Sequence, residues 1–174
     1  MRLNFLQKWL EGAPLTLESS CNLIMVEHHP VILELLDQSR HQLEALLNSK
    51  NYQHTLLPQL AQKLQLIHKQ IRQYIHTEQV YFFPYLKKQP KVEEKNNDIS
   101  LNDHLLKTMQ HKHDVFMKAL QHQRKIVNNY MIKKDWDAEF KSFINHLFLL
   151  EKKIQNWLML EQKNIYPFLT KASQ

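Results

Sequence analysis

Glycine is nearly absent from this sequence, which has one glycine, Gly12, and six prolines in 174 residues. Tight β-hairpins depend on glycine-containing turns, so the chain has almost none of the residues that such turns require. Most other positions carry residues that helices favour or tolerate, chiefly Leu, Gln, Lys, Glu and His. The composition therefore argues against a sheet protein and predicts an all-α fold.

Cysteines and long apolar runs are also scarce. Cys21 is the single cysteine, so the chain has no intrachain disulfide and no cysteine pair to hold zinc or an iron–sulfur cluster. Polar residues interrupt the first eleven positions, unlike a signal peptide, and no stretch approaches the roughly 20 apolar residues of a membrane span. We therefore expect a cytoplasmic protein with no membrane partner.

The net charge of +6 comes from lysines that are scattered along the chain. They occur in pairs and are interleaved with acidic residues, as at Lys87-Lys88, Lys133-Lys134 and Lys152-Lys153. This pattern is typical of solvated helix faces, and a nucleic-acid-binding protein would gather its cations into one patch. We expect no nucleic-acid partner.

The apolar spacing predicts one domain over residues 1–174, built as an up-down-up-down four-helix bundle with a short amphipathic helix at 3–11. Helix 1 is predicted over about 17–48, after Thr16, with a kink at Pro30. Helix 2 runs over about 58–87, beginning at Pro58, and its apolar stripe includes Leu60, Leu64, Ile67, Ile71 and Phe82. Helices 3 and 4 are joined at about 132–137, giving two hairpins over about 17–87 and 100–171.

An internal repeat relates the two hairpins. The segment EQVYFFPYLKK at 78–88 matches EQKNIYPFLTK at 161–171. Upstream, His29 in HPVILELL matches His113 in HDVFMKAL, and each glutamate follows its histidine at nearly the same spacing. The two hairpins are therefore predicted to be quasi-equivalent.

The repeated histidines and glutamates fall on the apolar stripes of their predicted helices. His29 lies in line with Val26, Ile32, Leu33 and Leu36, and His113 with Met109, Phe116 and Leu120. Glu78 continues the stripe of Ile67, Ile71 and Tyr74, and Glu161 that of Ile154, Trp157 and Leu158. Antiparallel hairpins would bring the two histidines and two glutamates to one level of the core.

Two buried carboxylates need cations, supplied either by a metal ion or by protonated histidines. Non-haem iron suits this mixed nitrogen and oxygen set, and manganese or zinc is an alternative. The neighbouring His28, His76 and His111 are predicted to turn away from the stripes. His146 and Glu151 are interpreted as a structural pair or as solvated residues.

These residues resemble the hemerythrin-like HHE cation-binding domains. That family has one histidine on each of its first and third helices and a His-x-x-x-Glu motif with an aromatic-Pro ending on the second and fourth, so the resemblance covers roughly residues 20–170. It implies a four-helix bundle that binds one or two iron ions through His29, Glu78, His113 and Glu161. It also implies a role in oxygen or nitric oxide handling, iron–sulfur repair or sensing.

The sequence departs from the family pattern at two positions. Tyr74 and Trp157 stand four residues before Glu78 and Glu161, where the family has histidine. A tyrosine phenolate binds ferric iron, whereas an indole has only an N–H donor and cannot ligate a metal.

Two functions therefore remain open. One is a metal protein with a reduced ligand set, including Tyr74, whose partner is a small diatomic ligand. The other is a metal-free degenerate bundle acting as an interaction or structural module, in which protonated histidines with raised pKa values neutralise the glutamates.

Enzymatic turnover of an organic substrate has little support. The sequence has no glycine-rich phosphate loop and no nucleophile-elbow motif. It predicts neither a protein partner nor an oligomeric state.

Overall fold

The computed structural model describes residues 15–49, 55–88 and 99–171, and throughout these ranges the regular structure is helical, with no strand. The elements in chain order are α2 (Leu17–Leu23), the π-helix η1 (Ile24–His28), α3 (His29–Asn48), α4 (Leu57–Thr77), the π-helix η2 (Glu78–Phe82), α5 (Phe83–Lys88), α6 (Ile99–Ile126), the 3-10 helix η3 (Asn128–Tyr130), α7 (Ala138–Asn164) and α8 (Tyr166–Lys171). The prediction of an all-α fold is confirmed. The predicted helix at 3–11 lies outside the described residues.

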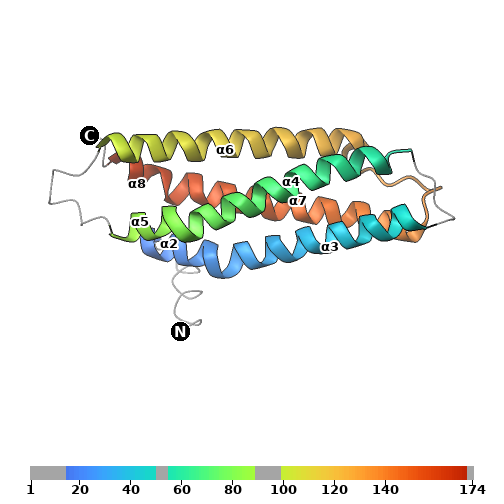
Figure 1. Ribbon diagram of the computed structural model, residues 1–174, viewed down its shortest axis with the longest axis horizontal. Coiled ribbons are helices and arrows are strands. Elements are labelled where there is room, and N and C mark those ends of the chain that lie inside the picture. The colour runs from blue at the N-terminus through green and yellow to red at the C-terminus, as the bar shows by residue number, and fades with distance from the viewer. Residues whose placement is uncertain (1–14, 50–54, 89–98, 172–174) are drawn as a thin grey trace.

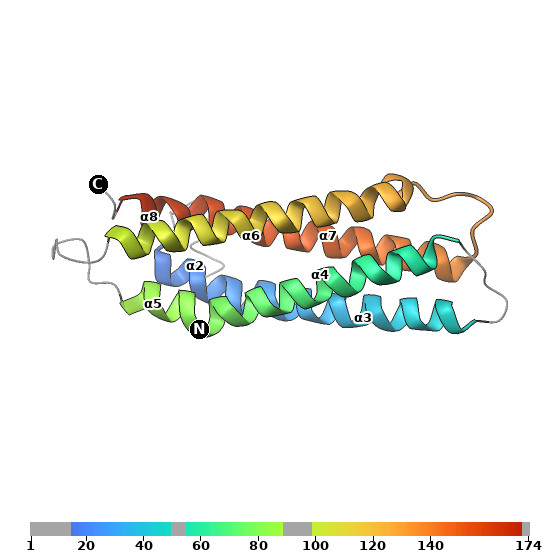
Figure 2. The ribbon, with the colours of Figure 1, turned by 45° about the horizontal axis from the view of Figure 1, so that its top comes forward.

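Four long helical segments lie side by side along the long axis of the molecule (Figure 1), and they remain side by side in the turned view of Figure 2. α3 packs against α4 and α7, and α4 packs against α6. Each segment contributes fully or almost fully buried side chains to the core, among them Ile32, Leu36, Ile67, Ile71, Met109, Phe116, Ile144 and Ile154. The core thus lies along the inner faces that the sequence stripes predict.

Local signals explain where these helices begin. The Thr16 side chain accepts a hydrogen bond from the Ser19 amide at 3.1 Å, which caps α2 as predicted. Pro58 stands in the first turn of α4, where its missing N–H leaves no bond unmade. Asp137 caps α7 by accepting from the Phe140 amide at 2.7 Å.

Two π-turns lie immediately before prolines. At each one the residue before the proline donates its amide five residues back, from His29 to Ile24 and from Phe83 to Glu78. A proline inside a helix needs such an interruption, because its ring clashes with the carbonyl four residues earlier and it supplies no N–H. For both prolines that carbonyl lies within the π-turn. The kink predicted at Pro30 is thus a π-turn.

The π-turns also alter the core positions around the two prolines. Each π-turn holds one more residue than an α-turn, so positions before it no longer share the α-helical register of those after it. Val26, predicted to face the core, is 57% exposed, while Ile24 is fully buried. Phe82 is only partly buried and Phe83 is fully buried instead. The stripe prediction at Val26 was wrong for this reason, whereas Phe82 still packs against the core.

Another buried carboxyl group, apart from the predicted ligands, is that of Glu151 in α7, which faces the end of α6. Glu151 is 1% exposed and accepts hydrogen bonds from Arg124, Tyr130 and Gln155. Tyr130 reaches it from a turn with positive φ at three successive residues, Asn128–Tyr130. His146 instead hydrogen-bonds the Leu35 carbonyl at 3.0 Å. Glu151 is therefore neither solvated nor paired with His146, because Arg124 supplies its countercharge.

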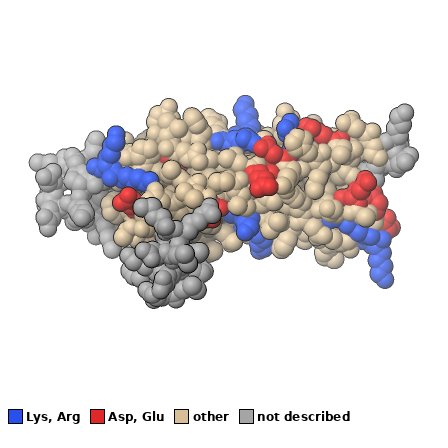
Figure 3. Space-filling view, turned by 90° about the horizontal axis from the view of Figure 1, so that it is seen from below, with Lys and Arg blue, Asp and Glu red and all other residues tan. Residues whose placement is uncertain are grey.

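Charged residues of both signs share the surface. Figure 3 shows Lys and Arg interspersed with Asp and Glu on the face in view. Across the described ranges, no helix combines the length and apolar character that crossing a membrane requires.

Candidate metal centre

All five predicted ligands are buried. His29, Glu78 and Glu161 are 0% exposed, His113 is 2% exposed and Tyr74 is 3% exposed. They come from different helical segments: His29 opens α3, Tyr74 lies near the end of α4, Glu78 opens η2, His113 lies within α6 and Glu161 lies near the end of α7. The predicted inward orientation of these residues is confirmed.

Each histidine contacts the glutamate of its own hairpin. The Nε2 atom of His29 lies 2.9 Å from Oε2 of Glu78, and that of His113 lies 2.8 Å from Oε2 of Glu161. Both distances are those of strong hydrogen bonds involving a carboxylate. The quasi-equivalence predicted from the repeat therefore extends to the contacts of these side chains.

The outer nitrogen of each imidazole has a different kind of partner in the two hairpins. The amide nitrogen of Gln79 lies 3.2 Å from Nδ1 of His29, and the Tyr166 hydroxyl lies 2.7 Å from Nδ1 of His113. An amide nitrogen only donates, so the proton of His29 is placed on Nε2, facing Glu78. A hydroxyl donates or accepts, so His113 is free to carry its proton on either nitrogen.

Aromatic rings enclose both imidazoles in matching positions. Phe83 stacks on His29 with centroids 6.0 Å apart, and its repeat counterpart Tyr166 stacks on His113 at 5.3 Å. The second ring comes from the other hairpin in each case. Trp157 meets His29 edge-on at 5.3 Å, and Tyr74 meets His113 edge-on at 6.1 Å.

Tyr74 and Trp157 thus take equivalent places in the two hairpins with different chemistry. The Tyr74 hydroxyl lies 3.5 Å from Nε2 of His113 and 3.4 Å from Oε2 of Glu161. The indole nitrogen of Trp157 is buried and has no hydrogen-bond partner. Position 74 therefore brings an oxygen to the second pair, and its hydroxyl also hydrogen-bonds Glu78 of the first, whereas position 157 brings only an N–H group and a ring.

Both carboxyl groups have unmet bonding capacity. Oε1 of Glu78 and Oε1 of Glu161 are buried without a hydrogen-bond partner. An unsatisfied buried polar atom costs about 1–3 kcal/mol, and more when it is charged. A cation beside these carboxyl groups would offset that cost, so the residues present fit a metal ion.

Burial dominates the proton affinities of the centre. Burial, followed by the negative charge of Glu161, raises the pKa of Glu78 well above its usual value. Burial, with a smaller effect from His28, lowers the pKa of His29 to about 3. Burial and the two carboxylates raise the pKa of Tyr74 well above 10. The raised histidine pKa predicted for a metal-free protein is therefore wrong for His29, because burial and the neighbouring His28 both lower it.

Other potential ligands lie apart from the centre. His76 and His111 are exposed and His28 is half-buried, as predicted from their angular positions. Within the described ranges, no three or more His, Cys, Asp or Glu side chains are grouped so as to hold a metal ion. A third ligand of another type, such as Tyr74, would therefore be needed.

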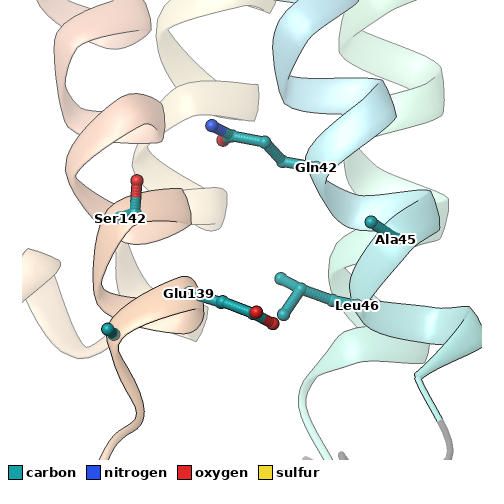
Figure 4. Close-up of a pocket in the computed structure, with 6 residues that line it drawn as sticks. Gln42, Ala45, Leu46, Glu139 and Ser142 are labelled. Atoms are coloured by element: carbon teal, nitrogen blue, oxygen red, sulfur yellow. The ribbon is translucent and has the colours of Figure 1, made fainter.

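Sequence reasoning missed Gln79, Phe83 and Tyr166 as parts of the centre. All three belong to the repeated motif, so the signal was present in the residues that follow each glutamate. A surface pocket of about 410 Å³ lies elsewhere, between the end of α3 and the start of α7 (Figure 4). Its lining, which includes Gln42, Glu139 and Ser142, shares no residue with the centre.

Comparison of the chain with models of known protein families finds no match, and comparison with curated proteins finds none either.

Proposed function

We propose that this protein is a hemerythrin-like metal-binding protein: an up-down-up-down four-helix bundle that holds non-haem iron in its core. Manganese and zinc are the alternative ions. The proposed ligands are His29, Glu78, His113, Glu161 and Tyr74. One observation carries the proposal: two buried carboxyl groups, each beside an imidazole, each keep one oxygen without a hydrogen-bond partner.

The distances within the pairs support metal ligation. Two ligands at right angles around an ion with bonds of about 2.1 Å are separated by about 3 Å. The nitrogen-to-oxygen distances of 2.9 Å and 2.8 Å match that separation. An imidazole and a carboxylate so placed can bind one ion without a large movement.

The surrounding residues have defined tasks in this proposal. Tyr166 orients the His113 ring through Nδ1, as outer hydrogen-bond partners of ligating histidines do. Phe83, Phe116 and Trp157 pack around the ligands and exclude water. A bound ion would supply an open coordination position, and the proposed partner there is a small diatomic molecule, oxygen or nitric oxide.

The second candidate is a metal-free bundle acting as an interaction or structural module. It is favoured by the direct hydrogen bond between each histidine and its glutamate, which needs no ion. In this case a protonated Glu78, with its raised pKa, rather than a protonated His29, would keep the buried charge small.

Counting metal ions separates the two candidates. The protein is purified without a polyhistidine tag, reconstituted anaerobically with ferrous iron, freed of loose metal and measured by mass spectrometry. We expect one or two ions per chain in the wild type and none in a Glu78→Ala, Glu161→Ala double variant. A Glu34→Ala, Glu44→Ala double variant is the matched control, since both glutamates are exposed. A wild type without metal would overturn the proposal and leave the metal-free bundle.

A further inference from the structure

We infer that the centre holds a single ion, and that Tyr74 of the first hairpin completes its site with His113 and Glu161 of the second. This inference rests on the proposed metal function and deepens it by fixing the number of ions and the ligand set. It departs from a symmetric two-ion site, in which each hairpin would contribute equally.

Three atoms form the site. Nε2 of His113, Oε2 of Glu161 and the Tyr74 hydroxyl are separated pairwise by 2.8, 3.4 and 3.5 Å. Three neighbouring ligands on one face of an octahedron with bonds of about 2.1 Å are each about 3 Å apart. The three observed distances are thus only slightly longer than those expected around a bound ion. The three coordination positions on the opposite face of the octahedron are left for other ligands.

The first hairpin lacks the corresponding third ligand. Trp157 takes the place beside His29 that Tyr74 takes beside His113, with interplanar angles of 86° and 87°. Its indole nitrogen carries a proton and has no lone pair for a metal. The ring is also fully buried beside His29, where the core is closely packed.

The hydrogen bonds to Nδ1 of the two imidazoles also favour His113, rather than His29, as the ligand. A ligating histidine binds metal through one nitrogen and carries its proton on the other. Tyr166 permits this at His113 because its hydroxyl can accept from Nδ1. At His29 the Gln79 amide nitrogen is a donor facing Nδ1, so this amide must rotate to present its oxygen before His29 can ligate. The His29–Glu78 pair therefore stays a hydrogen-bonded neighbour of the ion.

The chemistry of Tyr74, His113 and Glu161 favours one kind of metal ion. A phenolate and a carboxylate are hard anionic oxygen donors, and with an imidazole they suit ferric iron better than a softer ion. Coordination of phenolate to ferric iron absorbs visible light, which gives the site a signature that His and Glu alone would not produce.

Three variants test the inference in the intact protein, with the iron content and the visible spectrum of the ferric form as readouts. We expect one iron per chain and a visible band in the wild type. Tyr74→Phe should lose the band and lower the iron content at least tenfold. Trp157→His should raise the content to two, because it places an imidazole beside His29 and Glu78. Trp157→Phe, the matched control, should keep one iron and the band.

The outcomes are distinguishable from a failure of the proposed function. No iron in the wild type would overturn the metal function itself, and this inference with it. Two irons in the wild type, or a band that survives in Tyr74→Phe, would overturn the single Tyr74 site while leaving metal binding intact. If Trp157→His fails to fold, as circular dichroism would show, the Tyr74→Phe result decides alone.

Discussion

The edge of Trp157 meets the imidazole of His29 at 5.3 Å and 86°, and this contact mirrors that of Tyr74 with His113. Each residue lies four positions before the glutamate of its own hairpin, yet each packs on the histidine of the other. The two halves of the centre are therefore interleaved, and a substitution in one hairpin alters the site of the other.

Removing the Tyr166 hydroxyl should destabilise the fold through the His113–Glu161 pair. Tyr166→Phe deletes the 2.7 Å hydrogen bond to Nδ1 of His113 and recreates the ring that Phe83 presents to His29. We expect a loss of about 1 kcal/mol in the free energy of unfolding, measured by urea denaturation. Tyr81→Phe should change nothing, since Tyr81 is 62% exposed. Equal stability of the two variants would show that the hydroxyl contributes nothing to the fold.

The contribution of Glu78 to the stability of the metal-free protein should fall as the pH rises above about 4.5, while that of His29 offsets it up to about 6.5. The folded pKa of Glu78 lies above its unfolded value, so its contribution is complete below the unfolded pKa and is lost as the pH rises through the folded pKa. The slope for one proton is about 1.4 kcal/mol per pH unit. Glu78→Gln should remove this decline in denaturation measured with chelator present. An unchanged slope would mean that Glu78 ionises as freely in the folded chain as in the unfolded one.

The contribution of His29 to the stability of the metal-free protein should fall as the pH drops below about 6.5, opposite in direction to that of Glu78. Its folded pKa of about 3 lies below its unfolded value of about 6.5, so its contribution is complete above 6.5 and is lost as the pH falls towards 3. The wild type should therefore lose about 1.4 kcal/mol per pH unit from this group within that window. The difference in unfolding free energy between the wild type and His29→Gln isolates the effect. A difference independent of pH would contradict the neutral buried imidazole.

Arg124 should stabilise the fold through Glu151. Arg124→Met leaves a carboxylate that is 1% exposed with only Tyr130 and Gln155 as donors. We expect a loss of about 1–3 kcal/mol, below the cost of breaking a fully buried ion pair because the Arg124 side chain is 36% exposed. Lys125→Met, at an exposed neighbouring position, is the control. A similar loss in both variants would trace the effect to general surface charge.

The repeat predicted the centre better than the hydrophobic stripes did. Matching the two glutamates and the two histidines identified both pairs, because the same contacts recur in each hairpin. The stripes failed at Val26, since they assume a uniform 100° per residue and the π-turn before Pro30 breaks that register. Pro30 gave the location of the first interruption but not its form, and the interruption before Pro84 was not predicted.

Other features depend on contacts that no local pattern encodes. Glu151 is buried because Arg124 and Tyr130 reach it from the preceding helix and turn. The low pKa of His29 follows from the depth of its burial, with a smaller effect from His28. Both outcomes depend on the balance between desolvation and pairing, and a sequence read by periodicity does not supply the distances that set this balance.

The burial of the centre also has a kinetic consequence. Since none of its five side chains is more than 3% exposed, nothing reaches them from solvent unless the helices separate locally. If the centre binds iron as proposed, the rate of iron loading should therefore become independent of the iron concentration once iron binding is faster than reclosing of the helices. The maximum rate of iron loading is then the rate at which the helices open locally. Hydrogen exchange of the backbone amides around Glu78 measures that same opening rate.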